Sequence, residues 1–124
     1  MKAYTDIEQS HKLAEILPIE SADMYLDYNF HGQKYEYYLR VMDDQFDDVC
    51  IPCWSLAALL CVIHQEIFNG KYVINITKSI NHKWLITYDS YGHNKSFRSL
   101  GVSDNCLVDA CVAMVEKLHE RNLL

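Results

Sequence analysis

The sequence predicts a single α+β domain over residues 1–124, in which three helices pack on an antiparallel sheet of about five strands. Three observations support this class. The chain of 124 residues is 50% hydrophobic and 23% charged, a composition typical of one globular domain. Apolar residues recur at helical spacing in three segments and alternate with polar residues in others. The strand-like segments come in adjacent pairs, and the predicted order is α-β-β-α-β-β-β-α.

The first predicted helix covers residues 6–17. Thr5 and Glu8 have the spacing of a capping box, in which the two side chains satisfy free backbone N–H groups at a helix start. Apolar residues then recur at helical spacing, and Pro18 ends the run because proline lacks a backbone N–H.

Two tyrosine-rich strands, residues 23–30 and 33–41, are expected to form a hairpin next. His31-Gly32 would be its two-residue turn, since glycine adopts a positive φ at little cost. This register places Asp27 opposite Glu36, and like charges in that arrangement repel each other. A slip of the register or a bulge is therefore an alternative.

An apolar helix from Leu56 to Ile67 follows, and Asn69-Gly70 is expected to stop it. Small apolar residues fill its other positions, so we expect this helix to be the most buried element. Residues 72–76 and 84–88 alternate in the manner of two strands, and a short third strand is expected near residues 95–99.

The last predicted helix starts after Ser103 or Asp104, either of which can cap it. Its apolar face recurs at helical spacing and consists of Leu107, Cys111, Met114, Val115 and Leu118. Helices that interrupt antiparallel strand pairs in this way are expected to pack on one face of the sheet.

The net charge of −6 is unevenly distributed along the chain. Residues 1–70 carry four basic and twelve acidic side chains, whereas residues 71–98 carry five basic side chains and one acidic side chain. Such an asymmetry arises either from a charged partner surface or from the strand faces that meet water.

The N-terminal segment is polar and has no apolar h-region, so we expect no secretory signal. The longest apolar stretch, residues 56–63, is too short to span a bilayer, and no membrane partner is expected. Five cysteines without framework spacing suit a reducing compartment. The sequence therefore predicts a cytoplasmic protein.

The segment Cys50-Ile51-Pro52-Cys53 is a C-x-x-C motif with three interpretations: a redox centre, half of a zinc site, or the start of a helix. A redox cysteine needs a lowered pKa, and the acidic segment before the motif would raise that pKa. Zinc needs four ligands, and a second pair with suitable spacing is missing from the sequence. We therefore expect Pro52 in the first turn of a helix and both cysteines as small apolar residues, with no bound metal or cofactor.

The rest of the sequence shows no catalytic motif. The acidic residues 43–48 lack the spacing and the distal glutamate of an EF-hand, and the histidines are scattered. The chain also contains no P-loop, dinucleotide fingerprint or nucleophile elbow. The sequence therefore identifies no enzyme active site.

A basic segment offers a nucleic-acid interface as an alternative function. Its basic residues are Lys71, Lys78, Lys83, Lys95 and Arg98, and they interleave with Tyr72, Trp84, Tyr88 and Tyr91. Basic residues can neutralise phosphates while aromatic rings stack on bases. However, the strand aromatics alternate in phase with isoleucines that point to the core, and the chain as a whole is acidic.

Three segments, KLAEILPIESADMY (12–25), IPCWSLAALL (51–60) and SDNCLVDACVAMVEKLHERNLL (103–124), resemble a group of short uncharacterised proteins of phages and mobile elements of gut bacteria. The resemblance implies a small intracellular accessory protein, and it implies no catalytic or cofactor-binding residue. It also favours Pro52 and Trp54 as the residues that set and pack a helix start, with the cysteines incidental.

These observations favour a non-enzymatic interaction module that works through protein–protein contact, with a homodimer as one form of it. Tyr25 and Tyr38 would lie together on one face of the hairpin, and tyrosine suits interfaces because its ring is rigid and its tip is polar. The alternative for these two residues is packing under the protein's own helices. Nucleic-acid binding by the basic strands, and a thiol or zinc site at Cys50 and Cys53, are the other functional hypotheses.

Overall fold

The computed structural model describes residues 2–90 and 100–124. This part of the chain contains helices α1 (Ile7–Ile16), α2 (Leu56–Val62) and α3 (Leu107–Glu120), a 3-10 helix (Ile19–Ser21), and strands β1 (Met24–His31), β2 (Lys34–Val41), β3 (Ile51–Cys53), β4 (Glu66–Ile67), β5 (Tyr72–Lys78), β6 (Trp84–Ser90) and β7 (Val102–Asp104). The α+β class and the helix order are confirmed. The strands, however, form two antiparallel sheets, β2-β1-β3 and β4-β5-β6-β7, in place of one.

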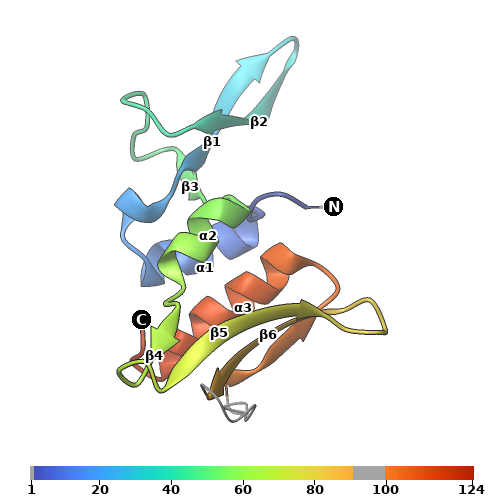
Figure 1. Ribbon diagram of the computed structural model, residues 1–124. Helices are drawn as coiled ribbons and strands as arrows, with labels where there is room; N and C mark the ends of the chain where they lie inside the picture. Colours follow the sequence, from blue (N-terminus) through green and yellow to red (C-terminus); the bar gives the residue numbers. More distant parts are fainter. Residues whose placement is uncertain (1, 91–99) are drawn as a thin grey trace.

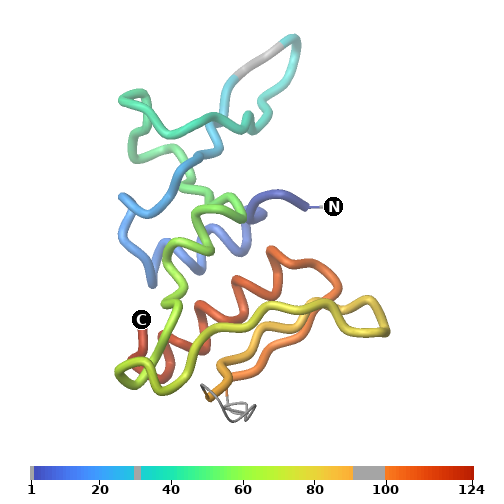
Figure 2. Tube along the Cα trace, viewed as in Figure 1, coloured from blue at the N-terminus to red at the C-terminus, as the bar shows by residue number. Residues whose placement is uncertain are grey.

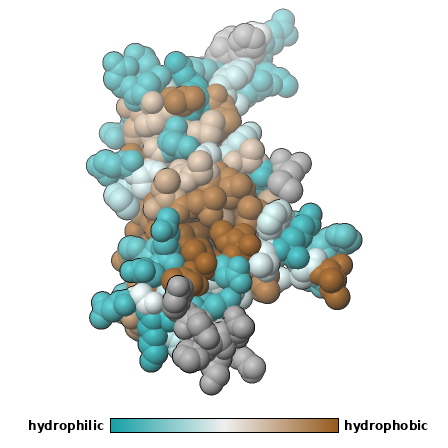
Figure 3. Space-filling model, viewed as in Figure 1, coloured by the Kyte–Doolittle hydropathy of each residue, from teal (hydrophilic) through white to brown (hydrophobic). Residues whose placement is uncertain are grey.

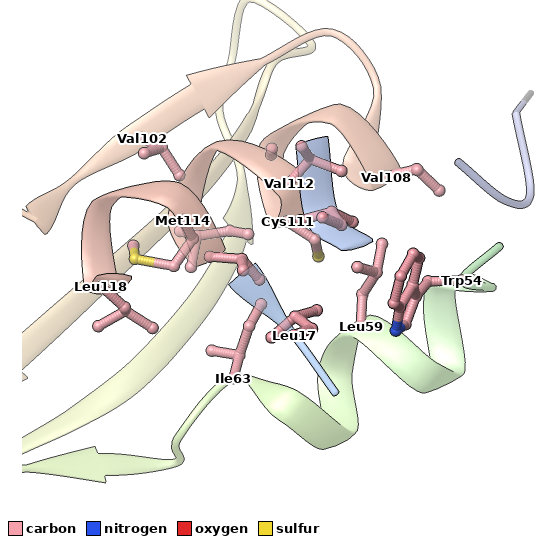
Figure 4. Packing of buried hydrophobic residues seen from close by; sticks show 14 of the residues in the cluster. Leu17, Trp54, Leu59, Ile63, Val102, Val108, Cys111, Val112, Met114 and Leu118 are labelled. Atoms are coloured by element: carbon pink, nitrogen blue, oxygen red, sulfur yellow. The ribbon is translucent and has the colours of Figure 1, made fainter. Parts of the chain in front are cut away.

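The core lies between the helices and the four-stranded sheet. In Figure 1, α3 lies along the sheet and α1 and α2 lie on the other side of α3. Figure 4 shows side chains from α2 and its flanks, among them Trp54, Leu59 and Ile63, gathered against α3. All three are almost inaccessible to solvent. The buried face of α3 is the predicted one, because its apolar residues recur at helical spacing.

Helix α1 is capped one residue later than predicted. Asp6 accepts a hydrogen bond from Gln9 N at 2.8 Å, and the Gln9 side chain accepts one from Asp6 N at 3.1 Å, which together form the capping box. Thr5 is fully buried instead, and its hydroxyl accepts a hydrogen bond from Trp54 N at 3.1 Å. The predicted cap at Thr5 is therefore wrong, because Thr5 joins the helix start to the segment before α2.

The tyrosine-rich hairpin forms, but its register is shifted by two residues from the predicted one. His31 pairs with Lys34, so Gly32-Gln33 is the turn, and Gly32 has a φ of 66°. Only the first central residue has a positive φ, as in a type II′ turn. Asp27 now lies opposite Tyr38, and the like-charge pair with Glu36 is avoided.

The predicted helix start at the C-x-x-C motif is wrong. Ile51–Cys53 is strand β3, with Pro52 opposite Tyr25 of β1. Proline is accepted there because β3 lies at the end of its sheet. Helix α2 begins after Ser55, whose hydroxyl accepts a hydrogen bond from Ala58 N at 3.2 Å.

Helix α2 is also shorter and less buried than predicted. It ends at Val62, and Ile67 belongs to β4. Asn69 and Gly70 have positive φ values of 57° and 83° and form the turn between β4 and β5. The side of α2 away from the core is exposed at Ala57, Leu60 and Cys61.

The predicted strands at 72–76 and 84–88 are confirmed as β5 and β6, which pair from Tyr72–Ser90 to Lys78–Trp84. The strand expected near residues 95–99 lies outside the described residues. Helix α3 follows β7, and its N-cap is Cys106, which makes no side-chain cap. Asp104, one of the two predicted caps, accepts a hydrogen bond from Cys106 N at 3.1 Å instead.

Candidate protein-binding surface on the tyrosine hairpin

The β1–β2 hairpin projects from the helices and the four-stranded sheet. Figure 1 shows it at the end of the molecule opposite β5 and β6, and the chain trace in Figure 2 shows the same separation. One face of the hairpin is rich in exposed aromatic and apolar side chains. We call this the tyrosine face, and it comprises Tyr28, Tyr35, Tyr37 and Val41, which are 49%, 61%, 44% and 71% exposed.

The register explains why these rings come together. Tyr28 lies directly opposite Tyr37 across the two strands, and their ring centroids are 4.7 Å apart. Tyr28 also stacks on Tyr35, with centroids 5.3 Å apart and ring planes inclined by 22°. Tyr28 therefore packs against both of the other rings, while the surface of all three stays open to solvent. Rings already ordered in this way lose little conformational entropy when they bind.

The opposite face of the hairpin is covered near its base, at Tyr25, and this overturns the predicted role of Tyr25. Tyr25 is fully buried, and its hydroxyl donates a hydrogen bond to Asp43 at 2.7 Å. The ring of Phe46 meets the ring of Tyr25 edge-on at 5.5 Å, so the segment after β2 folds over this face. Tyr25 cannot serve as an outward interface anchor in this conformation. The segment after β2 covers it through Asp43 and Phe46.

Loss of hydration, together with the Asp43 carboxylate, raises the pKa of Tyr25 to about 12. The same hydrogen bond holds the pKa of Asp43 below its ordinary value. Arg40 completes the group, with its guanidinium 5.9 Å from the centre of the Tyr25 ring and 3.4 Å from Asp27. Tyr38 shares this face, is half-buried, and donates a hydrogen bond to Glu36 at 3.2 Å.

The two edges of the three-stranded sheet differ. Beyond β3, the N-terminal segment continues the hydrogen bonding, since Thr5 N donates to Trp54 O at 2.9 Å and Leu56 N donates to Ala3 O at 3.1 Å. Strand β2 ends the sheet on the other side, where its only strand partner among the described residues is β1. An edge strand of this length offers backbone groups for pairing with another chain.

Cys50 and Cys53 are both buried, and they contact different parts of the molecule. The Cys53 thiol donates to Thr5 O at 3.2 Å, whereas the Cys50 thiol lies 3.4 Å from an oxygen of Asp47 and 3.9 Å from one of Asp27. The extended chain turns positions three apart to opposite sides. Burial raises the pKa of the Cys50 thiol, which opposes the reactivity of a redox centre.

The described part of the basic segment does not form one patch. Lys71 precedes β5, whereas Lys78 ends it and Lys83 precedes β6, so Lys71 is about 20 Å from the other two along the strand. Lys78 places its ammonium group 5.3 Å from the centre of the Trp84 ring, and Tyr88 is fully buried. Lys95 and Arg98, together with Tyr91, lie outside the described residues.

The outer face of the four-stranded sheet carries no basic residue among those described. By the strand register it consists of Glu66, Val73, Asn75, Thr77, Leu85, Thr87, Asp89 and Ser103. Only acidic and uncharged side chains occur in this set, and such a face repels phosphates more than it attracts them.

Two cavities are lined by residues outside the hairpin. One of about 360 Å³ lies between α1 and α3 and is lined by Lys12, Glu15, Ile16, Glu116, His119 and Glu120. The other, of about 460 Å³, is lined by Lys2, Ala3, Tyr4 and Asp6. Within residues 2–90 and 100–124, no three His, Cys, Asp or Glu side chains are grouped in a way that could hold a metal ion. The described helices also include none with the length and apolar character needed to cross a membrane.

Comparison with family models, with curated proteins and with solved structures finds no match for this chain. The resemblance to short phage and mobile-element proteins therefore stays a prediction, as does the cytoplasmic location. The sequence pattern does not reveal the tyrosine face, because alternation distinguishes the two faces of a hairpin and does not say which one a later loop will cover.

Proposed function

We propose that this protein is an interaction module that binds a protein partner through the tyrosine face of the β1–β2 hairpin. The observation that carries the proposal is the exposure of three tyrosines, two of which pack their rings against Tyr28, on a hairpin that projects away from the helical core. Contiguous exposed apolar surface is disfavoured in water and commonly marks an interaction site.

The chemistry of the tyrosine face suits a protein partner. Tyrosine offers a large, rigid apolar ring at a small entropy cost, and its hydroxyl can bind polar groups at the rim of an interface. Charged side chains lie on the other face of β2, where Lys34 contacts Glu36 at 2.7 Å. The tyrosine face itself is aromatic and uncharged, as the centres of protein–protein interfaces usually are.

Helix α2 supports the same class of function with a second exposed apolar surface. Its outward residues Ala57, Leu60 and Cys61 are exposed, and Figure 3 shows an apolar area over this part of the molecule. We assign the primary contact to the tyrosine face because its rings are larger and already ordered by stacking.

The first experiment places the photo-crosslinking residue benzoylphenylalanine at position 37 of the full chain and irradiates cells that express it. We expect protein adducts from position 37. The matched control is position 68, since Phe68 is 48% exposed and lies at the β4–β5 turn, far along the chain from the hairpin. Equal adducts from both positions, or none from position 37, would overturn the proposal.

The second experiment uses a triple variant that carries Tyr28→Thr, Tyr35→Thr and Tyr37→Thr. Threonine keeps strand propensity, so the hairpin is expected to persist while the aromatic surface is lost. Purified partner, identified from the adducts, should bind the triple variant at least about tenfold more weakly, because aromatic residues dominate the binding energy of most interfaces. Circular dichroism and thermal unfolding verify the fold, and unchanged affinity would contradict the proposal.

A further inference from the structure

The inference concerns which partner the hairpin accepts, and it rests on the proposed function. We infer that the partner is a second copy of this chain, which pairs through the open edge of β2 in an antiparallel register centred on Tyr38.

The hydrogen-bonding pattern of the hairpin fixes which backbone groups of β2 point outward. Met42 N donates to Asp23 O at 2.9 Å, so these two residues form a hydrogen-bonded pair across the strands. Such pairs alternate with non-hydrogen-bonded pairs along an antiparallel ladder. Tyr38 and Arg40 therefore bond toward β1, whereas the N–H and C=O groups of Tyr37 and Leu39 point away from it.

This pattern limits how two copies of β2 can pair. The outward N–H and C=O groups of one β2 must bond to the outward C=O and N–H groups of the other β2. These groups belong to the odd-numbered residues of β2, so Tyr37 and Leu39 have to lie opposite odd-numbered residues of the second copy. The odd-numbered residues of β2 are also the ones whose side chains lie on the tyrosine face. Every allowed register therefore places the two tyrosine faces side by side.

Charge selects between the two registers that pair almost the whole strand. A register centred on Tyr37 places Lys34 opposite Arg40 of the second copy, and these like charges repel. A register centred on Tyr38 places Glu36 opposite Arg40 of the second copy and, by symmetry, Arg40 opposite its Glu36. These are non-hydrogen-bonded positions, where facing side chains come closest. The charge pattern of the strand is therefore complementary to itself about Tyr38.

The side chains involved are accessible for such a pairing. The side chains of Glu36 and Arg40 are 39% and 43% exposed. In this register, Tyr37 lies beside Leu39 of the second copy on the joined tyrosine face. The hairpins run antiparallel, so the tip of each lies beside the base of the other. The 71% exposed Val41, at the base, is thereby covered. The product is a six-stranded sheet with one helical body at each end.

The test is sedimentation velocity of the full chain over a dilution series. We expect a concentration-dependent dimer in the wild type. Glu36→Arg, which would face Arg40 of the second copy at two symmetric positions, should weaken the dimer about tenfold or more. Glu120→Arg is the matched control, with the same change of charge at an exposed position on α3, and it should leave the dimer unchanged.

A backbone variant tests the edge directly. Leu39→Pro removes an outward N–H that β1 does not use, so the hairpin should form while the dimer is lost. Leu39→Ala removes more of the side chain and keeps the N–H, and it should retain the dimer. In hydrogen exchange, the Tyr37 and Leu39 amides should become protected as the protein is concentrated.

The outcomes separate this inference from the proposed function. A wild type that stays monomeric at every concentration overturns self-pairing, and adducts from position 37 that contain a different protein would then leave the proposed function standing. A dimer that survives Glu36→Arg and Leu39→Pro and is lost in the triple tyrosine variant also overturns edge pairing. A monomer that gives no adducts from position 37 overturns both.

Discussion

At the residue scale, the environments of the tyrosines differ more than their sequence context suggests. Tyr25 and Tyr88 are fully buried, whereas Tyr28 and Tyr37 are exposed. The Tyr88 hydroxyl donates to the carbonyl of His64, and the Tyr25 hydroxyl donates to Asp43. Each buried phenol therefore donates its proton to an acceptor oxygen. A deprotonated phenolate has no proton to donate, so this hydrogen bond is lost when the phenol ionises. The ionised form is disfavoured by burial and by the lost hydrogen bond.

This difference predicts a loss of stability at alkaline pH. Burial raises the pKa values of Tyr25 and Tyr88 from 10.0 to about 12. Between pH 10 and pH 12 the unfolded chain releases these protons while the native chain keeps them, so the unfolded state binds fewer protons and the free energy of unfolding falls as pH rises. Below pH 10 the contribution is fully present. Urea unfolding followed across this range measures it.

A pair of variants isolates the contribution of Tyr25. Burial also raises the pKa of the Cys111 thiol to about 11, and this adds a loss of the same sign, so the comparison is made between variants. Tyr25→Phe should flatten the alkaline loss, because no phenol is left to ionise at that position. Tyr37→Phe changes an exposed tyrosine and should keep the wild-type slope. Equal slopes in the two variants would contradict the assignment.

At the element scale, the start of α2 joins the hairpin to the helical body. Asp23, just before β1, accepts a hydrogen bond from Ser55 N at 2.9 Å and another from the Ser55 hydroxyl. Ser55 in turn caps α2 by accepting from Ala58 N. The helix has seven residues, too few for stability from its own hydrogen bonds. Its position therefore depends on this cap and on tertiary packing.

The cap predicts a measurable cost on substitution. Ser55→Ala removes the cap acceptor and the hydrogen bond from the hydroxyl to Asp23, and it should lower the free energy of unfolding by about 1–2 kcal/mol. Ser103→Ala is the matched control, because Ser103 is exposed on β7, and it should change stability by less than about 0.5 kcal/mol. Chemical unfolding of both variants provides the comparison, and equal midpoints would refute the role of the cap.

The hairpin shows how the residues of its turn set the register of its two strands. The strands and their tyrosine alternation were predicted correctly, but the turn was placed at His31-Gly32 and lies at Gly32-Gln33. A type II′ turn needs glycine at its first central position, and a two-residue shift leaves every side chain on the same face. The pattern of faces alone therefore could not reveal the error, whereas the Asp27–Glu36 repulsion correctly pointed to a slip.

At the scale of the whole molecule, charge is distributed in a way that disfavours nucleic acid. The net charge is −6, and the outer face of the four-stranded sheet has only acidic and uncharged residues among those described. The described lysines of the basic segment lie at opposite ends of the β5–β6 hairpin. Phosphate binding requires basic groups that act together along one surface.

We therefore expect labelled single- and double-stranded oligonucleotides to show no binding to the full chain at moderate salt. Fluorescence anisotropy measures this, and a salt titration identifies any phosphate contacts by their slope. Binding that falls steeply with salt, and that is lost in Lys83→Glu/Arg98→Glu, would revive the nucleic-acid hypothesis.

The sequence by itself determined the α+β class, the three helices, the faces of the hairpin and the buried face of α3. These features depend on periodicity, which is a local property of the chain. The role of Trp54 as a packing residue was also expected, and the structure buries it fully, with its indole N–H donating to the Ser21 hydroxyl at 2.9 Å.

Only the tertiary structure decided which surface of the hairpin is open and what the C-x-x-C motif becomes. Tyr25 and Tyr28 belong to the same strand, and the fold of residues 42–50 over one face buries Tyr25 and leaves Tyr28 exposed. The same return of the chain pairs Ile51–Cys53 with β1 and makes a strand of a segment that looked like a helix start. Such long-range pairing depends on where a loop leads the chain, and local residue patterns do not encode that direction.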